Sequence, residues 1–505
     1  MPAKSTVPTA DREFFRWVAS AAFANPFSEQ RLELDRKITG GTFKNQAERG
    51  EFLKHSVSDR VARLAAQGQA DLRIYSGDDR ELMRLVFLFE VYHQIFEQLD
   101  QFIDAQVKAG DRSLPVPFAV EALGLLGARG FSSEEARRFF GIFFQIRRAF
   151  HFVVQELIGE SDCMKAFRRH LWDNVFTHDI RWYDRYLWSR MEDFSTLLLG
   201  ETGTGKGTAA AAIGRSGFIP FDERKGCFAE SFTRGFVSLN LSQYPETLIE
   251  SELFGHRKGA FTGAVEAHEG VFARCSPHGA IFLDEIGDVS TPVQIKLLQV
   301  LQERTFSPVG SHEKQRFRGR VIAATNQPLD ALRDKNVFRD DFFYRLSSDV
   351  ITVPPLRQRL QETPEELNFL VEHLVMRMTG EAAPELVALV LEVLNQGIGR
   401  NYAWPGNVRE LEQAVRRILL KRRYDGDTRG VAADLRSHLL AGLDNGSLDA
   451  DALLGGYCAL LHERHFTIEE VARRTNLDRR TVKRYLALHT SARLPDGSTT
   501  LGSSA

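Results

Sequence analysis

The chain has 505 residues, enough for about three domains at about 150 residues each. Hydrophobic residues make up 43% and charged residues 26%, the balance of a soluble globular protein, and the net charge of −2 excludes a molecule that binds nucleic acid through its overall charge. Four widely spaced cysteines without a CxxC pair argue against a zinc site or disulfide framework, and the lack of a signal peptide or long apolar span predicts a cytoplasmic protein with no membrane segment.

Residues 1–158 are predicted to form an all-helical N-terminal region. Apolar residues recur at steps of three and four from Glu81 to Val107, and a second such stripe follows a capping pair, Ser132 and Glu135. Strands do not alternate with helices here, which argues against a phosphorylatable receiver domain. The many phenylalanines of these stripes are predicted to form a core or a subunit interface, with a small-molecule pocket as the alternative. Sensing, regulation and oligomerisation remain open as roles for the region.

Residues 159–194 are predicted to be a helical linker, after which the pattern changes. Four short apolar runs, STLLLG, GFVSLN, AIFLDE and RVIAATN, alternate with helical stretches across residues 195–354. Buried strands separated by helices predict a parallel sheet with helices on both faces. Residues 355–425 return to helix, so the expected fold is an α/β domain followed by a helical lid. One lid helix is predicted to begin at Asn407, with Glu410 three residues on as its capping partner.

A glycine-rich loop joins the first predicted strand to an alanine-rich helix. Its glycines allow the backbone to fold around an anion, and the helix N-terminus adds its dipole. Lys206 is expected to reach the β- and γ-phosphates of ATP, whereas Gly207 replaces the usual magnesium-binding Ser or Thr. Taken alone, the loop also fits a glycine-rich turn without a ligand. The predicted nucleotide-binding residues here are Gly200, Glu201, Thr202, Gly203, Thr204, Gly205, Lys206, Gly207 and Thr208.

Polar residues follow two further strands. Asp284 and Glu285 end the run AIFL, and because the carboxyl ends of parallel strands share one edge of a sheet, they are expected beside the glycine-rich loop. Asp284 is predicted to hold Mg²⁺, and Glu285 to orient or deprotonate the attacking water. Asn326, after VIAAT, is placed to sense the γ-phosphate. The alternatives are solvated strand-end carboxylates and a turn-forming asparagine.

Residues 447–489 are predicted to form a small all-helical unit. A polar linker (426–446) precedes it and a disordered tail (490–505) follows it. Two helices with a tight turn are expected, the second capped by Asp478, and its outward residues would enter the major groove of double-stranded DNA. A charged helical hairpin or an oligomerisation unit is the alternative. The predicted DNA-binding residues are Arg479, Arg480, Thr481, Lys483 and Arg484.

Four sequence blocks of the central region follow one another in a fixed order. They are ESELFGHRKGAFTGA (250–264), GAIFLDEIGD, FRDDFFYRL (338–346) and WPGNVRELE (404–412). Together they resemble the AAA+ domain of sigma-54-dependent activators, also called bacterial enhancer-binding proteins, over roughly residues 158–425. The C-terminal unit resembles the Fis-type helix-turn-helix of the same family. The resemblance implies an AAA+ P-loop fold, ATP and Mg²⁺ as cofactors, and a homo-oligomer that ranges from a dimer on DNA to a hexameric ring.

The resemblance also implies roles for single residues. Arg339 and Arg345 match arginine fingers that reach a neighbouring subunit's ATP, Asn240 matches the residue that switches Glu285 between idle and active states, and Arg409 matches the second sensor arginine. Apart from the family, surface ion pairs and a strand-end cap are the ordinary interpretations of the two fingers and of Asn240.

The GAFTGA hexapeptide is expected to contact sigma-54. A phenylalanine flanked by Gly and Ala in a loop exposes apolar area, which favours a partner surface, although a Phe that plugs its own domain is the alternative. Phe261 and Thr262 would make the contact, with the glycines as hinges. The loop comprises Gly259, Ala260, Phe261, Thr262, Gly263 and Ala264.

These patterns predict a sigma-54-dependent transcription activator. The helix-turn-helix would bind upstream DNA, and a ring of ATPase domains would remodel sigma-54 RNA polymerase from the closed to the open complex. One rival is an AAA+ remodeller of other proteins. The other is a DNA-binding regulator with an inactive ATPase, because the family usually has Glu where Gly207 stands. The segment 214–235 is longer than expected and has no predicted role.

Overall fold

The computed structural model describes residues 5–328, 338–399, 402–426, 439–440, 442–443, 448–463 and 467–491. The chain divides into two compact units, one of Met1–Val393 and Asn401–Arg422, the other of Leu394–Arg400 and Arg423–Ala505. Among the described residues, no helix combines the length and apolar character that crossing a membrane requires. The predicted linker and tail lie largely outside the described residues.

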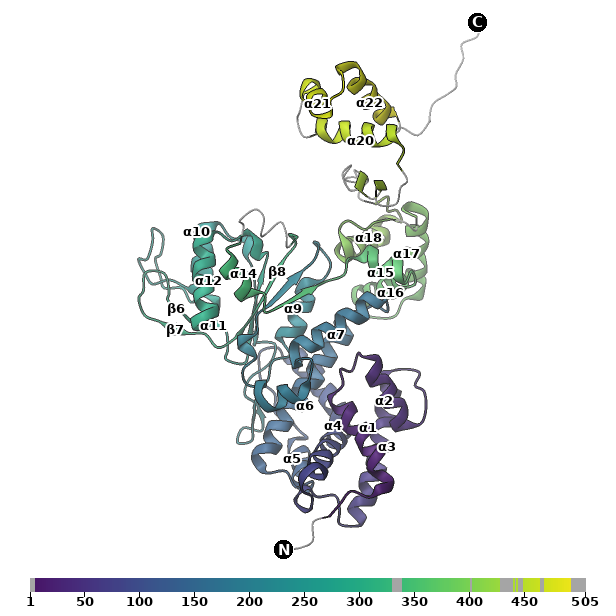
Figure 1. Ribbon diagram of the computed structural model, residues 1–505. Coiled ribbons are helices and arrows are strands. Elements are labelled where there is room, and N and C mark those ends of the chain that lie inside the picture. The colour runs from purple at the N-terminus through teal and green to yellow at the C-terminus, as the bar shows by residue number, and fades with distance from the viewer. Residues whose placement is uncertain are drawn as a thin grey trace. The chain divides into compact units, whose positions relative to one another are not determined.

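The N-terminal region is helical, as predicted (Figure 1). The first apolar stripe forms α4 (Gly77–Ala109), and the second forms α6 (Ser133–Glu156). The predicted capping box of α6 is confirmed, because the Ser132 hydroxyl accepts from the Glu135 N–H while the Glu135 carboxylate accepts from the Ser132 N–H. The remaining elements up to the sheet are α1 (Thr9–Phe23), α2 (Glu29–Thr39), α3 (Gln46–Ala66), η1 (Leu72–Ile74), α5 (Ala119–Ala128), α7 (Asp162–Phe176), α8 (Ile180–Trp182), η2 (Tyr183–Leu187) and η3 (Met191–Asp193).

The centre of the chain is a five-stranded, all-parallel sheet in the order β4-β5-β8-β1-β9. The four predicted strands are confirmed. The fifth, β9, was not predicted, because DVIT is short and only half apolar and gains its place by pairing beside β1. The strands are β1 (Thr196–Leu199), β4 (Phe236–Asn240), β5 (Ala280–Asp284), β8 (Arg320–Thr325) and β9 (Asp349–Thr352).

Helices cover both faces of this sheet, as predicted. Alternate residues of β5 separate into two clusters, with Ala280 and Phe282 toward one and Ile281 and Leu283 toward the other. The first face, here called the α9 face, packs against α9 (Lys206–Gly214), which in turn contacts α6 and α7. The second, the α12 face, is covered by α10 (Glu246–Phe254), α11 (Val271–Arg274), α12 (Thr291–Glu303) and α14 (Asp340–Leu346).

The unexpectedly long segment 214–235 has a structural role. It forms a small antiparallel hairpin, β2 (Phe221–Asp222) with β3 (Cys227–Phe228), whose aromatic rings enter the N-terminal helical cluster. The Phe228 ring stacks on Phe144 of α6 with centroids 3.9 Å apart, and Phe221 meets Phe140 edge-on at 5.0 Å. One continuous core therefore joins the N-terminal helices to the α9 face of the sheet.

Four helices follow the sheet and form the lid. They are α15 (Leu356–Glu362), α16 (Glu366–Thr379), α17 (Pro384–Gly397) and α18 (Asn407–Lys421). The buried Glu366 carboxylate accepts from the backbone N–H of Glu160 and of Ser161, which fixes the start of α7 against the lid. Smaller elements beside the sheet are η4 (Leu241–Gln243), η5 (Ile286–Asp288), β6 (Thr305–Phe306) and β7 (Gln315–Arg316).

The C-terminal unit contains three described helices, α20 (Ala450–Glu463), α21 (Ile468–Thr475) and α22 (Arg479–Ser491). Val471, Val482 and Tyr485 pack with residues of α20 in a small apolar core. Asp478 caps α22 as predicted, because its carboxylate accepts from the N–H groups of Arg480 and Thr481. The turn passes through Asn476, which is left-handed with φ 55°.

Candidate nucleotide and partner-binding sites

The glycine-rich loop after β1 wraps around its own lysine. Gly203 (φ 82°) and Gly205 (φ 103°) adopt backbone conformations that favour glycine, which lets the chain turn sharply into α9. Lys206 is only 7% exposed, and its Nζ donates to the carbonyl oxygens of Gly200 (2.8 Å) and Glu201 (3.3 Å). The lysine therefore lies inside the loop, with an ammonium group available for exchange onto an anion.

The surroundings of Lys206 shift its pKa in opposite directions. Burial lowers the pKa of Lys206, whereas the carboxylates of Glu285 and Asp284 act to raise it and Arg409 acts to lower it. Burial also disfavours the charged form of Glu285 and so raises its pKa, although Lys206 acts to lower it. The loop, the acid pair and the lid arginine thus lie within electrostatic reach of one another, as the sequence predicts for a nucleotide site.

Gly207 is exposed at the start of α9, directly after the lysine. The nearest heavy atom that an added Cβ would meet is on the Phe282 ring at 3.8 Å, an ordinary contact distance. The packing therefore has room for a side chain at this position. Thr208, the next residue, is half-buried.

The acid pair lies at the end of β5. Asn240 pairs in register with Asp284, and its Nδ2 lies 3.5 Å from Asp284 Oδ2, while its Oδ1 accepts from the Ser242 N–H. Glu285 has a left-handed backbone (φ 55°), which directs it away from the strand path. Asn240 thus meets Asp284 in this structure rather than Glu285.

Asn326 lies at the end of β8 and connects two parts of the site. Its backbone N–H donates to Glu285 Oε2 (3.3 Å), and its Nδ2 donates to Thr202 Oγ1 (3.3 Å). The structure therefore brings Asn326 to the glycine-rich loop and to the acid pair at once, where a γ-phosphate sensor is expected.

Asn407 is a site residue that the sequence analysis treated only as a helix start. The expected capping pair with Glu410 is not formed, because Asn407 (φ 53°) is fully buried and its side chain faces elsewhere. Its Nδ2 donates to Glu201 Oε2 and Thr202 O (both 3.1 Å), and its Oδ1 accepts from the Leu356 N–H. The Glu410 carboxylate accepts instead from the Gly406 N–H (2.7 Å). One asparagine thus links the loop to two lid helices.

Two further contacts join the lid to the loop. The exposed Arg409 donates its backbone N–H to Gly203 O (3.3 Å). Arg357 pairs with Glu201 through Nη1 and Nη2 at 2.7 and 2.5 Å. The sequence offered no signal for the Arg357 pair, because it joins residues 156 positions apart.

Arg339 and Arg345 lie at the two ends of α14. Arg339 is exposed and pairs with Asp341 at 2.8 Å, and this pairing raises the pKa of Arg339. Arg345 is partly buried, and its Nε donates to Leu301 O at the end of α12 (3.0 Å). In this chain both arginines are bonded to residues of α12 and α14 rather than to the glycine-rich loop.

The GAFTGA segment is an exposed loop between α10 and α11. It closes on itself, because the Gly259 N–H donates to Ala264 O (2.8 Å) and the Ala264 N–H donates to Phe261 O (3.0 Å). Gly259 (φ 78°) and Gly263 (φ 102°) both have conformations that favour glycine. Phe261 is 37% exposed and Thr262 is exposed, so the phenylalanine does not plug its own domain.

A histidine supports this loop from its base. His256 pairs with His268 through two backbone bonds (3.0 and 2.9 Å), and its ring meets the Phe261 ring edge-on at 4.9 Å. Its Nδ1 lies 2.7 Å from Ser251 Oγ on α10. The loop between β6 and β7 lies alongside, because the Arg257 N–H donates to Val309 O (3.1 Å). No motif in the sequence singles out His256.

The basic residues of α22 lie on the surface of the C-terminal unit. Arg480, Lys483 and Arg484 are exposed, and Arg479 is exposed with an ion pair to Glu469 at 3.2 Å. Thr481 is half-buried, and its hydroxyl donates to the capping Asp478 (2.6 Å). Its hydroxyl proton is therefore committed to the helix cap.

Comparison with known proteins identifies the central region. Residues 183–352 match the family described as the sigma-54 interaction domain. A Nif-specific regulatory protein from Azotobacter vinelandii is 40% identical over 253 residues, which are 50% of this chain and 44% of that protein. The DNA-binding transcriptional activator HyfR from Escherichia coli K12 is 38% identical over 293 residues, covering 56% and 40% of the two chains. The chain thus spans less than half the length of these relatives.

Solved structures also resemble the chain at low sequence identity. NtrX from Brucella abortus is 21% identical with a TM-score of 0.38, covering 73% of this chain and 79% of that one. A second crystal structure of NtrX, in complex with ATP, is 19% identical with a TM-score of 0.40, covering 73% and 80%.

Proposed function

The chain carries the sigma-54 interaction domain over residues 183–352, and from this premise we propose that it is a sigma-54-dependent transcription activator. It would bind upstream DNA and use ATP hydrolysis to remodel sigma-54 RNA polymerase from the closed to the open complex. The observation that carries this proposal is the exposed GAFTGA loop, which joins two helices covering the sheet whose strand ends hold the glycine-rich loop and the acid pair.

ATP would bind at the loop before α9. The backbone N–H groups of this loop and the N-terminus of α9 would hold the phosphates, and Lys206 Nζ would exchange its two carbonyl bonds for phosphate oxygens. Asn326 and Arg409 would lie near the γ-phosphate. Within the described residues no three His, Cys, Asp or Glu side chains gather into a metal site. Mg²⁺ would therefore be held by Asp284 together with the phosphates and water, which is its ordinary coordination in nucleotide sites.

Hydrolysis would depend on Glu285 and on a neighbouring subunit. Glu285 would orient the attacking water, and Asn240, whose Nδ2 lies 3.5 Å from Asp284 Oδ2, would switch Glu285 between idle and active states. Arg339 and Arg345 would act across the interface of a ring, most simply a hexamer, by stabilising negative charge in the transition state. Each of the two arginines bonds to a residue of α12 or α14 instead of the glycine-rich loop of its own chain, which supports action in trans.

The output would be the GAFTGA loop. Its backbone bonds are short-range and its two glycines carry the positive-φ turns, so the loop can change conformation without unpacking the sheet. Phe261 and Thr262 would contact sigma-54. The C-terminal unit would supply DNA binding through Arg479, Arg480, Lys483 and Arg484, with Thr481 at the helix start.

Open-complex formation on a sigma-54 promoter tests the proposal. Purified full-length protein, sigma-54 holoenzyme and ATP are mixed, and single-strand reactivity reports melting at the start site. Melting that requires ATP and is lost in Thr262→Ala, while ATP turnover persists, is expected. ATP turnover in wild-type protein without melting would contradict the proposal, provided that a known activator melts the same promoter in parallel.

The second candidate is a DNA-binding regulator whose ATPase is inactive. Gly207 favours it, because no hydroxyl or carboxylate follows Lys206 to assist magnesium binding. Turnover of ATP by wild-type protein at the same rate as Lys206→Ala would support this candidate. A clear difference between the two would exclude it.

A further inference from the structure

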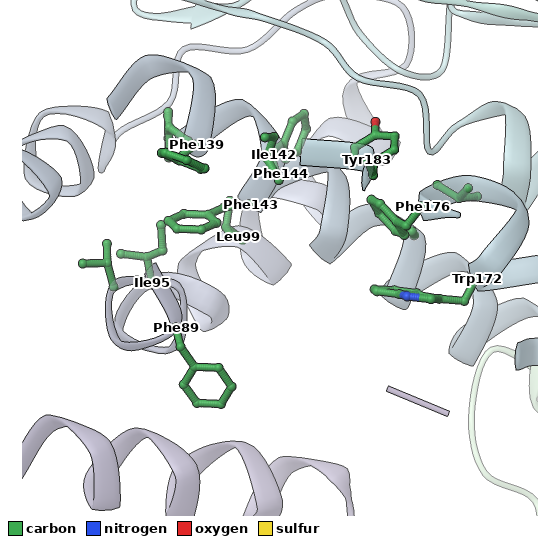
Figure 2. Packing of buried hydrophobic residues seen from close by; sticks show 14 of the residues in the cluster. Phe89, Ile95, Leu99, Phe139, Ile142, Phe143, Phe144, Trp172, Phe176 and Tyr183 are labelled. Atoms are coloured by element: carbon green, nitrogen blue, oxygen red, sulfur yellow. The ribbon is translucent and has the colours of Figure 1, made fainter. Parts of the chain in front are cut away.

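A cavity of about 440 Å³ lies within the N-terminal helical region. It is lined by residues of α1, α2, α3, α4, α6, α7, α8 and η2, and its volume falls in the range of about 300–1,000 Å³ typical of small-molecule sites. Aromatic side chains share its lining with aliphatic and charged ones. Figure 2 shows Phe89, Phe143 and Trp172, which come from three of these helices and line the cavity.

An unbalanced positive charge lies at one wall of the cavity. Arg31 and Arg49 both line it, and both pair with the same carboxylate, Asp35, which is fully buried. Two guanidinium groups thus share one negative charge. Arg31 also lies over the Phe89 ring, 5.5 Å from its centroid.

Donor groups remain available on both arginines. Arg31 uses Nε toward Asp35 (2.8 Å) and Nη1 toward Ala21 O (3.0 Å), and Arg49 uses Nε (2.6 Å) and Nη2 toward Asp35. Among the described residues, Arg31 Nη2 and Arg49 Nη1 have no hydrogen-bond partner. These two guanidinium nitrogens could each donate to one oxygen of a bound carboxylate.

The other acidic and basic side chains of the lining are His93, Arg147, Asp100, Asp184, Glu51 and Glu97. Burial lowers the pKa of His93 to about 3, so its imidazole is uncharged, and its ring stacks on Phe89 at 4.0 Å. Arg147 is paired with Asp100, and Asp184 with Arg84 and Arg138. Glu51 and Glu97 lie near the single ammonium group of Lys54, at 3.6 and 3.9 Å, so two carboxylates share one positive charge there. The site therefore combines apolar side chains with a cationic arginine pair at one wall and an acidic pair at another.

Helix α6 connects this cavity to the phosphate loop. Arg147 lines the cavity, whereas the next residue, Arg148, is fully buried on the side of α9. Arg148 donates to the carbonyl oxygens of Arg215 (2.6 Å) and Gly217 (2.7 Å), and Gln145 donates to Ser216 O (2.9 Å). These carbonyls end α9, and a cation there also complements the helix dipole.

Helix α9 is short, and its other end is the nucleotide site. It runs from Lys206 to Gly214, about 13 Å at the rise of an α-helix. Tyr183, another residue of the cavity lining, donates its hydroxyl to Gln145 Oε1 (2.7 Å). A change of packing in the cavity would therefore reach α9 through Gln145 and Arg148 directly.

We propose that this cavity binds a small organic carboxylate with a flat, aromatic body, and that its occupancy changes nucleotide affinity through α6 and α9. Binding to the cavity is independent of the proposed function, whereas its effect on nucleotide rests on it. The carboxylate would pair with Arg31 and Arg49, and its ring would pack among Phe89, Phe143 and Trp172.

Calorimetry on the full-length protein tests the binding. The probes are 1-naphthoate and its neutral analogue 1-naphthamide, and naphthoate is expected to bind one site at least about tenfold more tightly. Arg49→Met leaves Arg31 paired with Asp35, so the fold is retained and the preference for naphthoate is expected to be lost. Arg60→Met is the control, because Arg60 likewise pairs with an aspartate, Asp11, but lies outside the cavity.

A second variant guards against effects on folding. Ile146→Trp, on the cavity wall, is expected to block both probes by filling the space. Absence of saturable binding to wild-type protein, equal affinity for the two probes, or unchanged naphthoate affinity in Arg49→Met would each overturn the proposal.

The effect on nucleotide is measured as ADP affinity with and without saturating 1-naphthoate. A change of about fivefold or more is expected, with an equal reciprocal effect of ADP on naphthoate affinity. Naphthoate binding with unchanged ADP affinity would overturn the transmission through α6. A protein that binds naphthoate with the stated selectivity but binds no ADP would count against the proposed function and would support the cavity site.

Discussion

The two faces of the central sheet are both covered by helices, but the coverings differ in what they leave exposed. On the α9 face, Phe140, Phe144 and Phe228 are buried in a cluster that continues into the N-terminal helices. The covering of the α12 face instead carries the GAFTGA loop, where Phe261 is 37% exposed. One face thus ties the sheet to a second helical layer, and the covering of the other leaves an apolar side chain exposed.

The proposed nucleotide site lies at the strand ends, between these faces. Its loop is fixed by side chains from far along the chain, such as Asn407 and Arg357, whereas the GAFTGA loop is held by bonds among neighbouring residues. Long-range contacts resist local motion, and short-range ones permit it. The difference indicates which parts would stay fixed and which would move when nucleotide is turned over.

Removing one aromatic ring on the α9 face tests how much its packing against the N-terminal helices contributes to stability. Phe228→Ala is expected to lower the free energy of unfolding by about 3–5 kcal/mol, because a buried phenylalanine is replaced by a void. Thermal and denaturant unfolding measure it. Phe52→Ala, at an exposed phenylalanine of the N-terminal region, is the control and should change it little. An effect below about 1 kcal/mol for Phe228→Ala would mean that the N-terminal helices and the sheet are only loosely joined.

The strand-end site is tested through its lysine. Lys206→Ala is expected to lower ATP turnover by about 10²–10³-fold, the loss typical when a group that stabilises transition-state charge is removed. Turnover and nucleotide binding are measured together. Lys296→Ala, at an exposed position of α12, removes a lysine paired with Glu250 and should leave turnover and nucleotide binding unchanged. Equal turnover by wild type and Lys206→Ala would show that this loop is not the hydrolytic site.

The α12 face is tested at the exposed phenylalanine. Phe261→Ala is expected to abolish melting of the promoter while changing the free energy of unfolding by about 1 kcal/mol or less, because the side chain is 37% exposed and its ring meets His256 edge-on. Val265→Ala, at a neighbour that is 73% exposed, is the matched control and should retain melting. A large loss of stability in Phe261→Ala would place the ring in the fold rather than at a partner surface.

The smallest effect is expected at Gly207. Gly207→Ser is expected to reduce the Mg²⁺ concentration needed for half-maximal turnover by about threefold, because the position has space for a side chain and a hydroxyl there is a usual magnesium ligand. Gly207→Ala is the control for a side chain without a ligand atom. An equal change in both variants would assign the effect to helix stability rather than to metal binding.

Particular residues show which features could be predicted from the sequence alone. Four of the five strands were predicted because they are nearly continuous apolar runs, whereas β9 depends on pairing with β1 for its existence. The capping residues Ser132 and Asp478 act as predicted, because their partners lie within three residues. Asn407 was assigned a local cap and instead bonds to Glu201 and Leu356, partners that no local pattern reveals.

The sequence by itself determined the parallel sheet, the helical regions on either side of it, and the motifs at its strand ends. Those features depend on periodicity and on residues close together in the chain. Tertiary structure alone decided that the 214–235 hairpin enters the N-terminal core, that Arg148 bonds to carbonyls at the end of α9, and that residues of the aromatic stripes line a cavity beside Arg31 and Arg49. Each of these depends on side chains from distant helices, and a cavity is set by what the packing leaves unfilled, which no linear pattern records.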